Sequence, residues 1–335
     1  MITAKEHGEF VAAYSSETAR FYWLKGISVE KAKEMKLEEL KPFLADPREF
    51  NGMLKGPLSA CIEITPNCNL QCPVCFADKD RPEPSGETLE KRLKAMSDAG
   101  GVRIDLAGGE PTIRKDFADI VHRCIDLGMY PIMSTNGLMS DQNLEIVRQL
   151  KPQIRVSIHS LFPEDYGLKC TESGVLNRIF NNVSKLAEYG LNPGIQCVVT
   201  KSTAGQVEQI IQKVTELGCK SISLMQFVPH GPALARKAEF FVNDTHFYAM
   251  VGKMQQRFEG KIKVTGFGIS TRSNYLVSVE TDGNVYCNLP AEPYYKSCGN
   301  IDNTSFGELF ADKDFDHKKH VIHYALRGNN ELAGR

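Results

Sequence analysis

The stretch Asn67-Cys-Asn-Leu-Gln-Cys-Pro-Val-Cys-Phe76 decides the interpretation of this chain, because it places three cysteines in a C-x3-C-x2-C spacing directly after an apolar run. They are Cys68, Cys72 and Cys75. Structural zinc sites and ordinary ferredoxin-type clusters take four protein ligands, whereas this loop supplies three. Three thiolates can hold a [4Fe–4S] cluster and leave its fourth iron open to a small molecule. A zinc knuckle with a distant fourth ligand is the alternative.

A second motif, Leu106-Ala-Gly-Gly-Glu-Pro111, ends another apolar run about thirty-five residues downstream, roughly the length of one strand–helix–strand unit. Gly108 and Gly109 permit close approach of the backbone to a ligand, and Pro111 fixes the turn. At this distance from the cysteines, the motif resembles the second signature of the radical S-adenosylmethionine (radical SAM) enzymes. The resemblance implies that SAM occupies the open iron and that the backbone of the Gly-Gly-Glu-Pro segment, including Glu110, binds its amino group.

In that family the cluster delivers one electron, SAM is cleaved to methionine and a 5′-deoxyadenosyl radical, and the radical abstracts hydrogen from the substrate. The resemblance therefore predicts an enzyme, a lyase or an oxidoreductase, that needs a one-electron reductant such as flavodoxin or ferredoxin. This chain departs from the family at the residue before the third cysteine, where Val74 replaces the usual aromatic residue and Phe76 follows instead. An adenine contact at residue 74 would rest on its backbone or its small side chain.

The composition is that of an ordinary soluble protein, with 335 residues, 42% hydrophobic and 24% charged. A net charge of −1 provides no field for a nucleic-acid backbone. No apolar stretch approaches the roughly 20 residues of a membrane span, and the first residues lack the apolar segment of a signal peptide. Because the 10 cysteines are dispersed along a large chain, we predict a reduced, cytoplasmic protein with an oxygen-sensitive cluster.

From residue 58 onward, strand-like and helix-like patterns alternate, which predicts an α/β fold with a parallel sheet and right-handed crossovers. Strands are expected at 58–64, 102–106, 130–134, 154–158, 193–200 and 220–227, and helices at 87–99, 116–127, 141–150, 174–189 and 204–217. The family resemblance adds that this sheet curls into an open (β/α)6 partial TIM-type barrel. Both motifs fall at the carboxyl ends of strands, where ligands gather in such barrels.

The barrel is expected to span 56–228, between two further units. Residues 1–55 show helical spacing across 29–44 and predict an N-terminal helical extension; the lack of an alternating strand pattern there disfavours a peptide-leader-binding module. Residues 229–335 predict a small α+β appendage, with a helix at 244–258, short strands within 262–287 and a hairpin turn at 281–284. This tail resembles the twitch or SPASM appendage of radical SAM enzymes, which carries an auxiliary iron–sulfur cluster.

By family analogy, the ends of the third to sixth strands supply further SAM contacts, polar ones to the ribose and carboxylate and apolar ones to the adenine. The candidates are Ser134 and Asn136, Ser157 and His159, and Met225 and Phe227. Serine and asparagine also cap helices and form turns, which is the alternative for these residues. The histidine could face the substrate instead.

The appendage holds two cysteines, Cys287 and Cys298, whereas an auxiliary cluster should have three or four protein ligands. The segment 265–270 lacks the cysteine that the family often has before this hairpin. We therefore expect packed thiols first, a hydrogen-atom donor to a substrate radical second, and cluster ligands third. Arg272 is a candidate for binding a carboxylate or phosphate through its planar guanidinium.

Together these features predict a radical SAM enzyme that acts on a small polar molecule, such as a sugar, a nucleoside or a carboxylate-bearing metabolite. In size and layout the chain is loosely similar to twitch-bearing antibiotic-biosynthesis enzymes, and a decarboxylase like the one acting on cytosylglucuronic acid is the leading specific expectation. The alternatives are a peptide-modifying or methyl-transferring enzyme, since 72–77 also resembles a pterin-methylating group, and a non-catalytic metal-binding scaffold.

Overall fold

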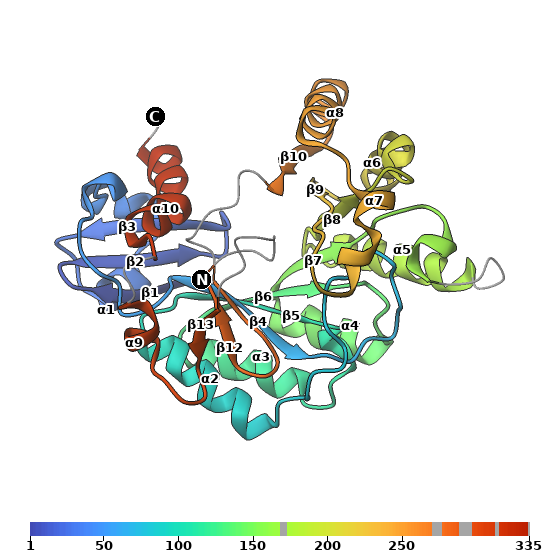
Figure 1. Cartoon of the computed structure of the whole chain (residues 1–335). Helices are drawn as coiled ribbons and strands as arrows, with labels where there is room; N and C mark the ends of the chain where they lie inside the picture. The colour runs from blue at the N-terminus through green and yellow to red at the C-terminus, as the bar shows by residue number, and fades with distance from the viewer. Residues whose placement is uncertain (168–172, 270–276, 288–296, 312–314, 334–335) are drawn as a thin grey trace.

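Two sheets organise the computed structural model, which describes residues 1–335 except 168–172, 270–276, 288–296, 312–314 and 334–335. A ten-stranded sheet has the order β10-β9-β8-β7-β6-β5-β4-β11-β12-β13, and a separate three-stranded sheet has the order β1-β2-β3. Figure 1 shows the large sheet curving around an open interior, with helices along its outer side. None of the described helices is both long and apolar enough to cross a membrane.

The six predicted strands and five predicted helices of the barrel are confirmed, each within a few residues. The strands are β4 (Ser59–Thr65), β5 (Arg103–Gly108), β6 (Tyr130–Thr135), β7 (Gln153–Ser157), β8 (Gly194–Val199) and β9 (Ser221–Gln226). The helices between them are α2 (Gly86–Asp98), α3 (Phe117–Asp126), α4 (Asp141–Leu150), α5 (Ser173–Glu188) and α6 (Val207–Glu216). Neighbouring strands from β4 to β9 all pair in parallel. This is the α/β fold that the alternating pattern predicts.

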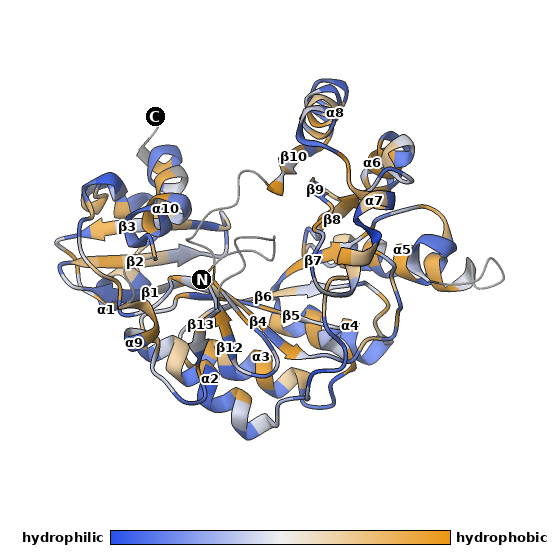
Figure 2. Cartoon of the chain, viewed as in Figure 1, coloured by the Kyte–Doolittle hydropathy of each residue, from blue (hydrophilic) through white to orange (hydrophobic). Residues whose placement is uncertain are grey.

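Residues along the barrel strands alternate between an apolar outer face and an inner face that carries several polar side chains. Ile62, Leu106 and Val156 are fully buried in the core formed with the helices, and Figure 2 shows apolar segments along the barrel strands. On the opposite face, Ser134 donates a hydrogen bond to Asp105 (3.0 Å), and Arg155 forms an ion pair with the same carboxylate. The barrel therefore has a polar interior that can receive a polar ligand.

The C-terminal residues extend the barrel sheet at both of its edges. The α8 helix (Asp244–Arg257) precedes β10 (Lys263–Phe267), which pairs in parallel with β9. At the other edge β11 (Ser278–Val279) pairs in parallel with β4, and the turn after it leads into β12 (Asn284–Tyr286) and β13 (Ser297–Asn300). The predicted hairpin turn at 281–284 is thus confirmed, although the appendage strands belong to the barrel sheet rather than to a sheet of their own.

The prediction of an all-helical N-terminal extension is wrong. Residues 1–25 form the antiparallel strands β1 (Ile2–His7), β2 (Phe10–Ser15) and β3 (Arg20–Lys25). The helical prediction is correct for the residues that follow β3. These form α1 (Val29–Glu34) and the 3-10 turns η1 (Leu37–Phe43) and η2 (Pro47–Glu49). Every residue of β2 is buried, because its two faces pack into two different clusters, so the strand has no polar face.

This N-terminal sheet covers the amino ends of the barrel strands. Thr3 donates a hydrogen bond to the carbonyl of Val102 (2.8 Å), and Tyr14 donates to the side chain of Gln153 (2.7 Å). The guanidinium of Arg103, the first residue of β5, lies over the rings of Tyr14, Phe21 and Tyr324, at 4.7 to 5.6 Å from their centroids. These contacts leave the carboxyl ends of the strands for a functional site.

The C-terminal helix α10 (His317–Ala333) lies along β3 and occupies part of its outer edge. Asn329 is buried, and its side-chain amide pairs with the backbone of β3. It forms the two hydrogen bonds that the backbone of a neighbouring strand would form. Its oxygen accepts from the backbone N–H of Trp23 (2.9 Å), and its nitrogen donates to the carbonyl of Trp23 (3.1 Å). At this position α10 therefore satisfies a sheet edge that would otherwise be open to another strand.

His7 makes the contact between sheet and barrel depend on pH. Its Nε2 lies 3.0 Å from the carbonyl of Gly100, and burial lowers its pKa from 6.5 to about 4. Because the unfolded chain binds a proton at higher pH than the folded chain does, this histidine makes the fold less stable as pH falls from 6.5 towards 4. The loss amounts to about 1.4 kcal/mol per pH unit.

We expect His7→Gln to remove this contribution. Between pH 6.5 and 4.5 the free energy of unfolding of the wild type should fall by about 2 to 3 kcal/mol more than that of the variant, as measured by urea denaturation. Parallel stability curves for the two proteins would contradict the assignment.

Candidate functional site

The three cysteines lie in the loop that leaves the carboxyl end of β4. All are half-buried, and the backbone N–H of Cys75 donates to the carbonyl of Cys72 (3.1 Å). Burial raises the pKa of Cys72 to about 12, with a further contribution from the charges of Cys75 and Cys68. Burial and mutual repulsion oppose ionisation of these thiols, so they would become thiolates beside a cationic partner, which an iron–sulfur cluster provides. The donor set therefore fits such a cluster.

Within the described part of the chain, no group of three Cys, His, Asp or Glu side chains is arranged to hold a single metal ion. The ligands of a zinc ion converge on one atom at about 2.3 Å. In a [4Fe–4S] cluster, by contrast, each cysteine binds a different iron, so the three sulfur atoms stand further apart.

Cys68 is held by two N–H groups that point to its sulfur. The backbone N–H of Leu70 lies 3.4 Å from the sulfur, and the side-chain nitrogen of Asn136, from the end of β6, lies 3.7 Å from it. The same nitrogen donates to the side-chain oxygen of Asn69 (2.7 Å). Asn136, predicted to contact SAM, is therefore placed against a cluster ligand.

The Gly-Gly-Glu-Pro segment is bound directly to the cysteine loop. The backbone N–H of Gly109 donates to the carbonyl of Thr65 (2.7 Å), and that of Glu110 donates to the carbonyl of Asn67 (2.8 Å). Gly108 has a φ of +119°, and a Cβ on either glycine would overlap one of these two carbonyl groups. Since an ammonium group can only donate hydrogen bonds, carbonyl oxygens of this segment would receive the amino group of SAM.

The carboxylate of Glu110 is fully buried and turned towards the protein rather than towards a ligand. It accepts from the backbone and hydroxyl of Thr112 (3.1 and 2.6 Å), the hydroxyl of Thr135 (2.8 Å) and the backbone of Asn136 (2.7 Å). Burial raises its pKa, and these four donors oppose the shift. The contacts make Glu110 a residue that positions the loops after β5 and β6.

The predicted adenine contacts are brought together in part. Val74 packs against an apolar cluster that contains Phe227, so the cysteine loop meets the end of β9. Phe227 itself is fully buried, whereas Met225 is half-buried on β9 and Phe76 is exposed. Of these residues, Val74 also lines a small pocket together with His159 and Thr200.

The remaining predicted residues have separate environments. Ser134 is bonded to Asp105 inside the barrel, and Ser157 is half-buried at the end of β7. His159 accepts a hydrogen bond from the backbone N–H of Val198 at Nδ1 (3.1 Å), and burial lowers its pKa to about 4. It is therefore a neutral imidazole with its proton on Nε2, able to donate a hydrogen bond into the pocket that it lines.

Cys287 and Cys298 form a disulfide bond. Neither sulfur carries a hydrogen atom in this state, so a donor role for either one requires prior reduction. Arg272 lies outside the described residues.

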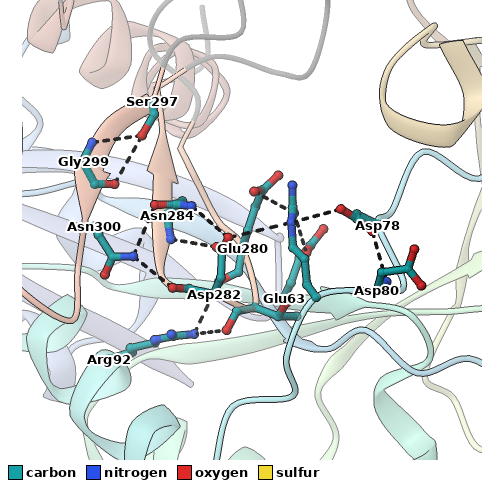
Figure 3. Close-up of polar contacts among 12 residues, drawn as sticks. Glu63, Asp78, Asp80, Arg92, Glu280, Asp282, Asn284, Ser297, Gly299 and Asn300 are labelled. Atoms are coloured by element: carbon teal, nitrogen blue, oxygen red, sulfur yellow. Dashed lines mark hydrogen bonds and ion pairs between the residues drawn. The ribbon is translucent and has the colours of Figure 1, made fainter.

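Sequence reasoning missed an ionic cluster beside the cysteine loop, shown in Figure 3. Its centre is Arg81, six positions after Cys75, and its carboxylates come from β4, from the loop itself and from the turn after β11. The signal available in the sequence was a single arginine in a loop that also holds Asp78 and Asp80. No local sequence pattern indicates that the turn after β11 lies beside Arg81.

Comparison with known proteins agrees with this geometry. The model of the radical SAM superfamily matches residues 62–214, which include both motifs. A probable GTP 3′,8-cyclase of Methanococcus maripaludis is 27% identical over 180 residues, 52% of this chain and 60% of that protein. A PqqA peptide cyclase of Bradyrhizobium diazoefficiens is 25% identical over 220 residues, 62% of this chain and 57% of that protein.

The fold is also that of a solved enzyme. SuiB of Streptococcus suis bound to its precursor peptide SuiA superposes with a TM-score of 0.69 at 16% identity, over 93% of this chain and 87% of SuiB. SuiB bound to S-adenosylmethionine gives a TM-score of 0.66. The identity is low, so this likeness establishes the fold alone.

Residues 62–214 are therefore a radical SAM domain, and the cofactors that this domain fits are a [4Fe–4S] cluster and S-adenosylmethionine. The matched segment spans about three fifths of the length of the two curated relatives. Their reactions and substrates are therefore taken up only as proposals.

The contact between Asn136 and Cys68 leads to a prediction. Hydrogen bonds to the sulfurs of an iron–sulfur cluster raise its reduction potential, because they stabilise the more negative, reduced state. Asn136→Ala should therefore lower the midpoint potential of the reconstituted cluster, measured by redox titration followed with electron paramagnetic resonance (EPR). Asn181→Ala, at an exposed position of helix α5, is the control, and equal potentials in both variants would contradict a role for Asn136.

Proposed function

We propose that this chain modifies a peptide by radical chemistry begun at the cysteine loop. The bound cluster and SAM supply a 5′-deoxyadenosyl radical able to abstract hydrogen. The observation that carries the peptide assignment is the N-terminal unit, a three-stranded antiparallel sheet followed by α1 and two 3-10 turns. The expectation of a small substrate rested on the supposed absence of strands there, and that argument no longer holds.

The relatives support this proposal. SuiB, whose likeness extends over 93% of this chain, was solved with a precursor peptide bound. The PqqA peptide cyclase is also named for a peptide substrate. Neither the curated relatives nor the structure named above is a nucleoside-sugar decarboxylase, so the expectation of that reaction gains no support.

The chain's own residues have distinct tasks in this proposal. Cys68, Cys72 and Cys75 hold the cluster, and the Gly108-Gly109 backbone holds the amino group of SAM. His159 donates a hydrogen bond at the pocket beside Val74. The inner face of the barrel, with the Asp105–Arg155 ion pair, offers polar groups to the peptide segment being modified. A flavodoxin or ferredoxin would supply the electron.

A nucleotide substrate is the second candidate, because curated relatives are GTP 3′,8-cyclases. The charged interior of the barrel, with Arg155, would suit a phosphate-bearing molecule as well. The two candidates differ in one property that is simple to test, which is sensitivity of the substrate to protease.

The test uses reconstituted enzyme, SAM and a chemical reductant with low-molecular-mass fractions from the source cells. Formation of 5′-deoxyadenosine should be stimulated by a fraction that loses this effect after protease treatment. Protein with Cys68, Cys72 and Cys75 all replaced by alanine is the control for cluster-dependent cleavage. Stimulation by a protease-resistant, phosphatase-sensitive fraction would instead support a nucleotide and reject the peptide proposal.

A further inference from the structure

Arg81 joins the cysteine loop to the appendage. It lies in the loop between β4 and α2, which also carries the three cluster cysteines. Its guanidinium Nη1 is 2.6 Å from a carboxylate oxygen of Glu280, the first residue after β11. The Arg81 side chain is 19% exposed and that of Glu280 is 6% exposed, so water screens this ion pair only weakly.

Three further carboxylates surround the same guanidinium. Asp78 lies 3.7 Å from it, and Glu63 and Asp282 each lie 3.9 Å from it. Burial, followed by the charge of Glu280, raises the pKa of Glu63 to about 7, while Arg81 opposes the shift. Four carboxylates thus share Arg81, and they repel one another wherever its charge is withdrawn.

The pairing of strands explains why this cluster forms. Ser278 and Val279 of β11 pair in parallel with Cys61 and Ile62 of β4. β4 continues to Thr65, and the same register carried one residue further places Glu280 beside Glu63. Arg81 is the residue of the cysteine loop that reaches this junction.

A second arginine holds the same turn from elsewhere. Arg92, on helix α2, forms an ion pair with Asp302 (2.6 Å) and donates hydrogen bonds to the carbonyls of Thr281 (2.9 Å) and Glu280 (3.4 Å). It anchors the hairpin to the barrel without touching the cysteine loop in these contacts. Arg92 therefore anchors the hairpin to helix α2, whereas Arg81 connects the hairpin to the cysteine loop.

We propose that Arg81 is a positioning residue that couples the appendage hairpin to the cysteine loop, so that the loop reaches its cofactor-binding geometry only while Glu280 is in place. Arg81 acts through the loop and not on SAM itself. This inference holds for any substrate, because it is tested by hydrogen–deuterium exchange of the cluster-free protein and by SAM binding of the reconstituted protein, neither of which needs a substrate.

The first measurement is hydrogen–deuterium exchange of the cluster-free protein. Arg81→Met should speed exchange within residues 66–85. Arg92→Met, the matched control, should speed exchange in β12 and β13 and lower the melting temperature. It should leave 66–85 unchanged, because the pairing of β11 with β4 still holds Glu280 in place.

The second measurement is SAM binding by the anaerobically reconstituted variants. Arg81→Met should weaken SAM binding about tenfold, a size typical of coupling between linked sites, and should alter the EPR change that SAM causes. Arg81→Lys should recover part of the affinity, since it keeps the charge. Arg92→Met should bind SAM as the wild type does.

A variant on the hairpin side provides an independent test where Arg81→Met folds poorly. Glu280→Gln leaves Arg81 with its other carboxylates and should loosen 66–85 and weaken SAM binding in the same direction. The proposal is overturned by wild-type exchange and SAM affinity in either variant. It is also overturned when Arg92→Met weakens SAM binding as much as Arg81→Met, because general anchoring of the hairpin would then explain both.

Discussion

The buried carboxylate of Glu110 is the constraint on which the site depends. A charged group without access to water is costly unless donors surround it, and Glu110 receives four. Those donors fix the turn after β5 and the end of β6. Through Asn136 the network continues to the sulfur of Cys68, so one carboxylate aligns both motifs.

The two ends of the barrel have opposite tasks. At the amino ends of the strands, the N-terminal sheet and helix α10 surround Arg103 with aromatic rings and close the interior. At the carboxyl ends, the cysteine loop, the Gly-Gly-Glu-Pro segment and the hairpin after β11 meet around Glu110 and Arg81. The site therefore lies where ligands gather in barrels of this kind.

The sequence predicted the barrel well and the N-terminal unit poorly, for one physical reason. In the barrel, each strand and helix shows the apolar periodicity of an element with one buried face. Strand β2 is buried on both faces, with Phe10 and Tyr14 in one cluster and Val11 and Ala13 in another. Such a strand gives a continuous apolar run, and one of its covers, α10, lies about three hundred residues away in the chain.

The residues of the site likewise fall into those that the sequence predicted and those that it did not. The cysteines and Gly108-Gly109 were predictable because each motif is local and its spacing reflects the chemistry that it performs. The contact of Arg81 with Glu280 was not, since it depends on the register between β4 and β11, which local patterns do not reveal. The same holds for the disulfide between Cys287 and Cys298, because the spacing of two cysteines does not determine whether they pair.

The most direct test of this account is SAM binding and iron content in Glu110→Gln, with Glu145→Gln on the exposed face of α4 as the matched control. The amide keeps the shape of the side chain but replaces an acceptor with a donor that faces other donors. We expect the variant to retain its secondary structure by circular dichroism, to hold less iron than the wild type, and to bind SAM at least about tenfold more weakly. A folded Glu110→Gln protein with wild-type iron content and wild-type SAM affinity would contradict the central role of this carboxylate.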